Sequence, residues 1–191
     1  MTASDLPVLT FESAAAWHEW LATEGERRPG VWLKFAKKGA AARTLSFDEA
    51  LAAALCFGWI DGQINRLDDQ YWLKRFTPRG AGSQWSRINT EKAEALTAAG
   101  LMQPAGLREV EKAKADGRWE RAYASQRNAT VPDDLQRALD ANEAASEFFA
   151  TISAINRYAI LYRIHTVKRP ETRARKIAEY VQMLAEQKTI H

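Results

Sequence analysis

Residues 46–76, SFDEALAAALCFGWIDGQINRLDDQYWLKRF, contain a change of hydrophobic period that decides the fold. Ser46 and Glu49 have the capping-box spacing, in which each side chain satisfies an unpaired amide in the first turn of a helix. The Ala- and Leu-rich run after them predicts that helix. Beyond it the pattern indicates two strands, 59–66 and 71–76, separated by a short Asp-rich turn. The stretch therefore predicts a helix followed by a β-hairpin.

The flanking sequence adds a second helix and a third strand. Residues 11–23 carry apolar side chains at helical spacing, and residues 31–37 have strand composition with alternate apolar positions. Residues 77–83 contain a proline and two glycines, which predicts a loop. A strand, a helix and a hairpin in this order favour a small antiparallel or mixed sheet with helices packed on it. We therefore expect an α+β fold.

The second half of the chain has helical patterns throughout. We expect Asn89 or Thr90 to cap the first of these helices. The last four helices are expected over 133–141, 144–152, 156–167 and 170–186. The polar residues 125–130 lead into Val131 and Pro132, the best candidate for a domain boundary. We predict an α+β domain over 1–125 and an all-helical module over 126–191.

The composition excludes several classes of protein. The chain has 191 residues, a formal net charge of +3, one cysteine (Cys56) and three scattered histidines. These counts exclude a disulfide framework and a zinc site built on paired thiolates, and the sequence has no Gly-rich phosphate loop. The longest apolar run, 50–60, is shorter than the ~18 residues of a membrane span, and residues 1–13 lack the features of an export signal. We expect a cytoplasmic protein without a metal or cofactor.

The loop 76–89 contains the residue types of an anion-binding site. Arginine binds phosphate in a bidentate way, serine hydroxyls and a helix N-terminus add donors, and tryptophan offers a stacking surface. Two interpretations remain open: Arg79 and Trp85 bind a ligand, or Trp85 is a core anchor and Arg79 makes a structural ion pair. Two lysines of the 31–37 strand join the site if the sheet orients them toward it. The candidate ligand-binding residues are Lys34, Lys37, Asp61, Arg79, Ser83, Trp85, Ser86 and Asn89.

Asp61 is the candidate catalytic residue. It follows Trp59 by two positions, where the helix gives way to a strand, and partial desolvation by an indole suits a carboxyl to proton transfer. In the alternative interpretation the carboxylate ties the turn by accepting hydrogen bonds from backbone amides. The corresponding alternative function is an enzyme in which Asp61 transfers a proton and Arg79 holds an anionic substrate.

The C-terminal part carries a local excess of basic residues. Residues 156–176 contain seven lysines and arginines against a single acid, Glu171. Two helices joined by a short basic turn present such residues to a nucleic-acid backbone. In the alternative interpretation they form an ordinary solvated face, with some arginines paired to acids. The nucleic-acid or anion-binding candidates are Arg157, Arg163, Lys168, Arg169, Arg173 and Lys176.

Six motifs follow one another along the chain: 30-GVWLKFAKKG-39, 54-ALCFGWIDG-62, 76-FTPR-79, 83-SQWS-86 with Asn89, 156-NRY-158 and 167-VKRPETRARKI-177. Together they resemble the bacterial YdeI/OmpD-associated family, from about residue 8 to residue 190. The resemblance implies a bacteriocin-protection or porin-associated protein without assigned catalytic residues, and porin association is implied by the family name only. The expected function is a non-catalytic cytoplasmic binding protein for a small anionic ligand. A stress or bacteriocin-protection role is implied by the resemblance alone.

Overall fold

The computed structural model describes residues 5–191, which form two compact units. Unit 1 extends to Ala122 and unit 2 is Tyr123–His191, and each is described by itself. That the segments 1–125 and 126–191 fold as separate domains stays a prediction. The prediction that no export signal is present rests in part on residues 1–4, which lie outside the described residues.

Unit 1 is built on a four-stranded mixed sheet with the strand order β1-β2-β4-β3. Its strands are β1 (Val8–Leu9), β2 (Val31–Ala36), β3 (Trp59–Arg66) and β4 (Tyr71–Pro78). β1 runs parallel to β2, whereas β2 and β3 each pair antiparallel with β4. The predicted hairpin is present, and β4 extends into the predicted loop because Trp59 pairs with Pro78. The two-residue β1 is too short for a sequence pattern to indicate it.

Most helices of unit 1 begin at a residue that caps them. They are α1 (Ala14–Glu24), the 3-10 helix η2 (Gly25–Arg27), α2 (Phe47–Cys56), α3 (Arg87–Ala98) and α4 (Pro104–Ala115). The predicted capping box is present at α2, where the Glu49 carboxylate accepts from the Ser46 amide at 2.8 Å and Ser46 Oγ accepts from the Glu49 amide. The prediction that Asn89 or Thr90 caps α3 is wrong. Ser86 caps it instead, and both predicted residues are buried in the first turn, where a cap does not lie.

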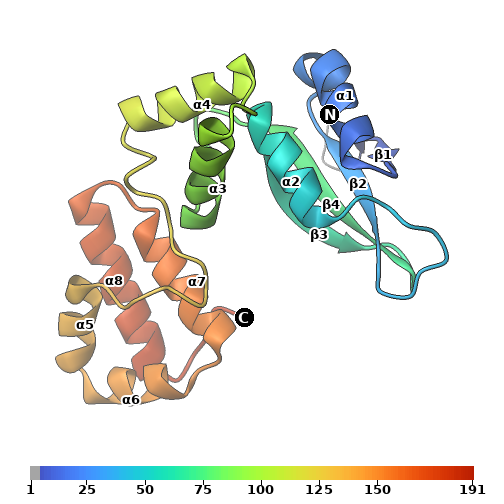
Figure 1. Cartoon of the computed structure of the whole chain (residues 1–191). Coiled ribbons are helices and arrows are strands. Elements are labelled where there is room, and N and C mark those ends of the chain that lie inside the picture. Colours follow the sequence, from blue (N-terminus) through green and yellow to red (C-terminus); the bar gives the residue numbers. More distant parts are fainter. Residues whose placement is uncertain (1–4) are drawn as a thin grey trace. The chain divides into compact units, whose positions relative to one another are not determined.

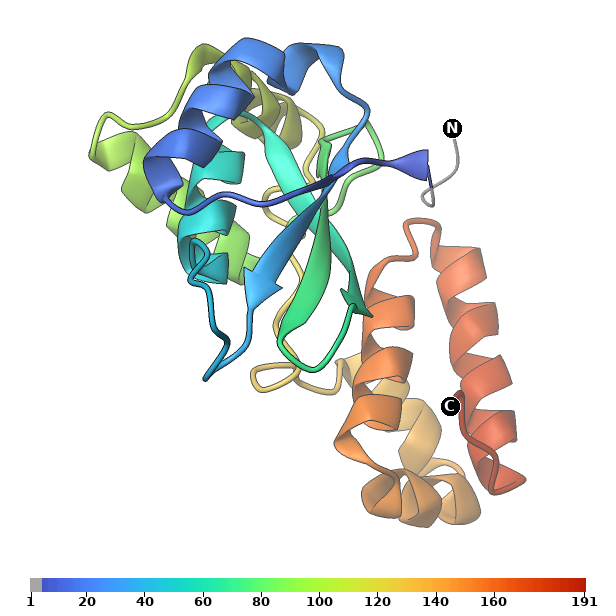
Figure 2. The ribbon, with the colours of Figure 1, turned by 90° about the vertical axis from the view of Figure 1, so that its right-hand side faces the viewer.

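Helices α1 and α2 cover one face of the sheet (Figures 1 and 2). The core between them centres on Trp17, which is fully buried and donates its indole N–H to Ala50 O at 3.1 Å. The rings of Trp59 and Phe76 meet the Trp17 ring edge to face. These contacts fix α2 on the sheet and so set where its first turn lies relative to the end of β2.

Gly106 allows α4 to lie directly against the end of α2. A Cβ atom at this position would be 2.2 Å from the Cys56 carbonyl oxygen, so no larger residue fits without a backbone shift. The Gln103 amide also donates to Cys56 O at 3.0 Å. This close approach places Glu109 and Lys112 of α4 beside the segment that follows β4.

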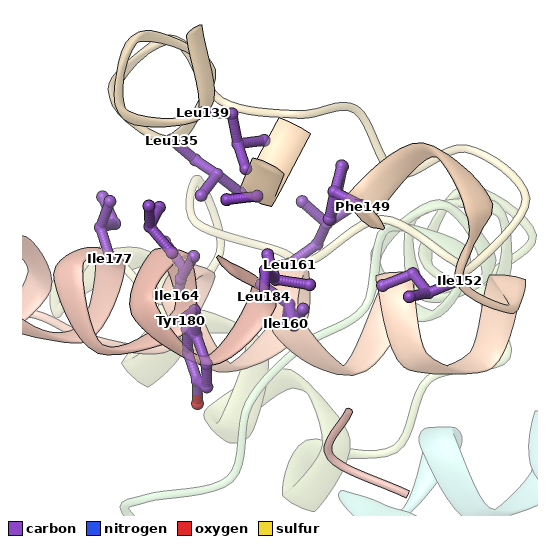
Figure 3. Packing of buried hydrophobic residues seen from close by; sticks show 12 residues of the cluster. Leu135, Leu139, Phe149, Ile152, Ile160, Leu161, Ile164, Ile177, Tyr180 and Leu184 are labelled. Carbon is purple, nitrogen blue, oxygen red and sulfur yellow. The ribbon is translucent and has the colours of Figure 1, made fainter. Parts of the chain in front are cut away.

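Unit 2 is all helical, as predicted. Its helices are α5 (Asp133–Asp140), α6 (Glu143–Thr151), α7 (Ala154–His165) and α8 (Pro170–Ala185). Apolar side chains from all four helices form one core (Figure 3), in which Leu135, Ile160 and Leu184 are fully buried. An α+β unit followed by an all-helical one is the predicted fold class, which is confirmed. No helix among residues 5–191 has the length and apolarity that crossing a bilayer requires.

Candidate functional site

The predicted ligand-binding residues lie at two ends of the sheet. Antiparallel pairing sets Lys34 opposite Leu73, near the start of β4. Lys37 lies just beyond β2, and its amide donates to Gln70 O, directly before β4 begins. Arg79 follows the last residue of β4. The structure therefore separates the two lysines from Arg79 along β4 and does not bring them into one site.

Arg79 and Trp85 are packed against each other. The Arg79 guanidinium lies 3.4 Å from the centroid of the Trp85 ring, and its Nη1 donates to Gln84 O at 3.2 Å. The two residues are only 7% and 1% exposed. Trp85 packs in turn on Trp119, with ring centroids 4.8 Å apart. A desolvated guanidinium on an indole is a favourable cation–π contact, so this pair holds the loop in place.

The other polar groups predicted in this loop make local hydrogen bonds. Ser83 Oγ accepts from the Gly80 amide at 3.0 Å, and Ser86 Oγ caps α3. Asn89 is 5% exposed inside the first turn of α3. These groups shape the loop and the start of the helix.

A cavity of about 360 Å³ lies beside Arg79. Its charged lining residues are Arg79, Lys112, Arg118, Glu109 and Asp116. Arg118 is 3% exposed, and its Nε donates to both carboxylate oxygens of Asp116. Lys112 donates to Glu109 at 2.7 Å. The acids offset the cations in this cavity, which weakens its attraction for an anion.

The cation beside Asp61 is Lys74 rather than Arg79. The Asp61 carboxylate lies 2.9 Å from Lys74 Nζ, and the two side chains are 21% and 17% exposed. Lys74 Nζ also lies 5.5 Å from the centroid of the Phe47 ring. Among residues 5–191 no backbone amide donates to this carboxylate, and no ion pair joins it to Arg79. Asp61 therefore belongs to an ion pair between two neighbouring strands.

A second cavity, of about 550 Å³, lies at the end of the sheet where β4 begins, and we name it the strand-end cradle. The loop 37–46 encloses it together with the end of β2, the start of α2 and one residue of β4. Figures 1 and 2 show this loop beside the turn between β3 and β4. The charged residues that line the cradle are Lys37 and Arg43, and its aromatic residues are Phe35, Phe47 and Trp72.

Both charged residues of the cradle are cations. Lys37 Nζ donates to Asp68 O at 2.7 Å, which positions the ammonium group. The Arg43 side chain is exposed, and no hydrogen bond or ion pair joins it to another of residues 5–191. Among the described residues 5–191 no acidic side chain lines the cradle, whereas two line the cavity beside Arg79. Acids therefore do not offset the two cations inside the cradle.

The loop of the cradle is anchored at several points. Thr44 Oγ1 accepts from the Ala36 amide at 2.9 Å and so joins the loop to the end of β2. Gln70 accepts from the Lys37 amide through its carbonyl and from the Ala41 amide through its side chain. These bonds fix the loop before any ligand arrives, which lowers the entropy cost of binding.

Two acids begin α2 close to the cradle, and both have partners. Asp48 pairs with Lys92 at 3.2 Å. Glu49 accepts hydrogen bonds from the Ser46 hydroxyl and amide, and these lower the pKa of its carboxyl. The charged Glu49 counters the positive end of the α2 dipole. The positive charge of the cradle therefore comes from Lys37 and Arg43.

Sequence reasoning missed Arg43, Phe47 and Trp72 as lining residues. The available signal was the run 37-KKGAAAR-43, in which basic residues flank small ones directly after a strand. Small residues leave backbone accessible, and flanking cations give such a loop its charge. Among residues 5–191 no group of His, Cys, Asp or Glu side chains is placed to hold a metal ion.

Three of the predicted nucleic-acid residues make structural contacts within unit 2. Arg157 donates to two carbonyls at the end of α6, the nearer at 2.9 Å. Arg173 binds the Asp134 carboxylate at 2.6 Å and a carbonyl near the end of α7 at 2.8 Å. Lys176 Nζ lies 2.9 Å from Glu179. These contacts tie helices to one another or pair charges within α8.

The other three predicted residues form an exposed group that we name the basic turn: Arg163, Lys168 and Arg169. Arg163 lies in the last turn of α7, and the other two lie between α7 and α8. No hydrogen bond or ion pair joins their side chains to the rest of the described chain. The structure thus divides the basic stretch into a structural half and a solvated half.

Two family models match the chain in separate parts. Residues 9–109, more than half of the chain, match a family described as a domain of unknown function (DUF8412), and the chain belongs to that family. Residues 128–187 match the family described as bacteriocin-protection, YdeI or OmpD-associated. The resemblance is therefore confirmed for the C-terminal part, whereas the N-terminal part falls under the other family. No curated protein and no solved structure matches the chain.

Proposed function

We propose that this member of the DUF8412 family binds a small anionic ligand in the strand-end cradle, without converting it chemically and in the cytoplasm. The observation that carries the proposal is the lining of the cradle, in which no acid of the described part of the chain accompanies Lys37 and Arg43. Two unit charges 4 Å apart attract by about 4 kcal/mol at the effective dielectric of a protein surface, so one accompanying carboxylate would cancel much of the effect.

The chemistry of the two cations supports an oxyanion. Arginine offers a planar fork of donors that matches phosphate or carboxylate, and lysine adds a compact charge with several donors. One Lys37 proton is engaged by Asp68 O, which leaves the other ammonium donors for a ligand. The family match over residues 128–187 supports a bacteriocin-protection role for this protein.

A thermal-shift titration tests the proposed function. The probes are inorganic phosphate, a sugar phosphate, a nucleoside monophosphate and benzoate, each added to the full-length protein. At least one should raise the melting temperature, because a ligand that binds only the folded state stabilises it by mass action. The shift should be lost in Arg43→Gln and reduced in Lys37→Gln.

Lys112→Gln is the matched control, because Lys112 lines the cavity beside Arg79 instead. It should leave the ligand-induced shift unchanged. The proposal is overturned if no probe shifts the melting temperature of the wild type. It is equally overturned if Arg43→Gln keeps the full shift or if Lys112→Gln alone abolishes it.

A second candidate function, nucleic-acid binding by unit 2, is favoured by the exposed basic turn. Three solvated cations in one short segment suit phosphate contacts, although three contacts support only weak binding. The logarithm of the association constant should then fall linearly as the logarithm of the salt concentration rises, with a slope no steeper than about −3.

Electrophoretic mobility shifts with a 30-nucleotide duplex and a single strand, at low salt, test this second function. Replacing Arg163, Lys168 and Arg169 together by glutamate should abolish binding. Arg173→Glu is not suited to this test, because it breaks the contact with Asp134 and perturbs the fold. Absence of binding at 20 mM salt, or binding that survives the triple change, removes nucleic-acid recognition by the basic turn.

A further inference from the structure

The aromatic residues of the cradle limit the kind of anion it takes. Phe35, Phe47 and Trp72 all line it, on β2, at the start of α2 and on β4. The Phe35 and Trp72 rings are stacked, with centroids 4.7 Å apart and planes inclined by 25°. Phe47 lies 6.1 Å from each of the other two ring centroids. Three rings from three elements therefore form one aromatic wall.

Part of this wall is solvent-accessible within the cavity. Phe35 is 2% exposed and belongs to the core, whereas Phe47 and Trp72 are partly exposed and pack on the core from its edge. Partly exposed aromatic surface next to cations is the combination that binds rings and charged groups together. Phe47 and Trp72 are thus the residues available to a ligand.

The volume of the cavity also favours an organic ligand over an isolated inorganic anion. A water molecule occupies ~30 Å³ in the liquid, so an isolated phosphate or carboxylate fills a small part of about 550 Å³. Cavities of ~300–1,000 Å³ are typical of sites for organic ligands. The loop adds room, since Gly39 has no atom within 4 Å of where its Cβ would be.

We propose that the ligand of the strand-end cradle is a small organic anion that carries a planar ring beside its phosphate or carboxylate group. The proposal rests on the proposed function and specifies the ligand class for the same site. The charged group binds Lys37 and Arg43, and the ring lies against Phe47 and Trp72. The ring adds affinity through its π-face, and the two cations supply the attraction for the charge.

Isothermal titration of the full-length protein with three matched phosphate esters tests the ligand class. Methyl phosphate carries the charge alone, cyclohexyl phosphate adds a non-planar ring, and phenyl phosphate adds a planar one. Phenyl phosphate should bind at least about fivefold more tightly than methyl phosphate, because this is the lower end of the effect of stacking one base on an aromatic side chain. Cyclohexyl phosphate should lie between them.

The ratio of the methyl to the phenyl dissociation constant is then measured in Trp72→Leu and Phe47→Leu. A loss of affinity that is equal for both esters does not change this ratio. If Trp72→Leu does not fold, Phe47→Leu provides the test. The ratio should fall toward one in both, whereas Arg43→Gln should weaken all three esters alike.

The results with the three esters distinguish failure of anion binding from failure of the aromatic ligand class. If no ester binds, the proposed function fails and the ligand class fails with it. If all three bind equally, the anion site stands and the aromatic ligand class is overturned. A ratio that stays unchanged in both ring variants also overturns it, because the ring would then lie elsewhere.

Discussion

The loops 79–86 and 37–46 contain similar chemistry at opposite ends of one sheet, yet their side chains have different surroundings. In loop 79–86 the arginine stacks on a buried indole, and the serine hydroxyl accepts from a backbone amide of the same loop. In loop 37–46 the backbone is held by Thr44 and by Gln70 on a neighbouring strand turn, so Arg43 remains exposed. The arginine of loop 79–86 is engaged in packing, whereas the arginine of loop 37–46 is exposed because uncharged side chains hold that loop.

The largest expected effect comes from the buried indole of loop 79–86. Trp85→Ala should destabilise the protein by about 3–5 kcal/mol, because it leaves a large cavity under Trp119 and Arg79. Urea denaturation measures this loss. Trp85→Phe is the matched control and should cost much less, since the indole N–H has no hydrogen-bond partner among the described residues. Equal stability of the alanine variant and the wild type would contradict the structural role of Trp85.

Arg79→Ala should have the next largest effect, a loss of about 1–3 kcal/mol from the cation–π contact and the packing of the guanidinium. Arg87→Ala, an exposed residue in the first turn of α3, should change the stability by less than about 0.5 kcal/mol. Both are measured by the same denaturation. If Arg79→Ala is as stable as Arg87→Ala, the loop is not held by Arg79, and its side chain is again a candidate for ligand binding.

Unit 2 also contains an arginine with a structural contact, because Arg173 forms an ion pair with Asp134. The hydrogen bond from Arg173 is the main cause of a lowered pKa of the Asp134 carboxyl. The stabilisation is therefore fully present above the ordinary aspartate pKa of about 3.9 and is lost as the pH falls through the lower folded value. Asp134→Asn should be less stable than the wild type at pH 7, and thermal unfolding should show this difference narrowing below about pH 4. A difference that stays constant down to pH 2 would contradict the assignment.

The smallest effect on stability is expected in loop 37–46. Arg43→Gln should change the free energy of unfolding by less than about 0.5 kcal/mol, because the side chain is exposed and makes no described contact. The same variant should lose anion binding, so stability and binding separate at Arg43, whereas at Arg79 the stability falls. A large loss of stability in Arg43→Gln would mean that the side chain is structural after all.

Much of the fold follows from local patterns in the sequence. The Ser46–Glu49 box and the alternation over 59–76 specify α2 and the hairpin, because both signals act between residues close in the chain. The candidate site does not follow in this way. Whether Lys37 lies near Arg79 depends on strand pairing, and whether Arg79 is buried depends on Trp85 and Trp119, which pack through tertiary contacts. Residue types alone thus predicted an anion site that combines Lys37 with Arg79, whereas strand pairing places these two residues at opposite ends of β4.

Amide shifts in ¹⁵N-labelled full-length protein titrated with phenyl phosphate show directly whether the ligand binds in the strand-end cradle. If the ligand binds in the strand-end cradle, the amides of residues 36–47 and the indole N–H of Trp72 should shift with a common dissociation constant, while the amides of residues 79–89 should not shift. Shifts concentrated at residues 79–89 or at the basic turn, or none at all, would contradict binding in the cradle.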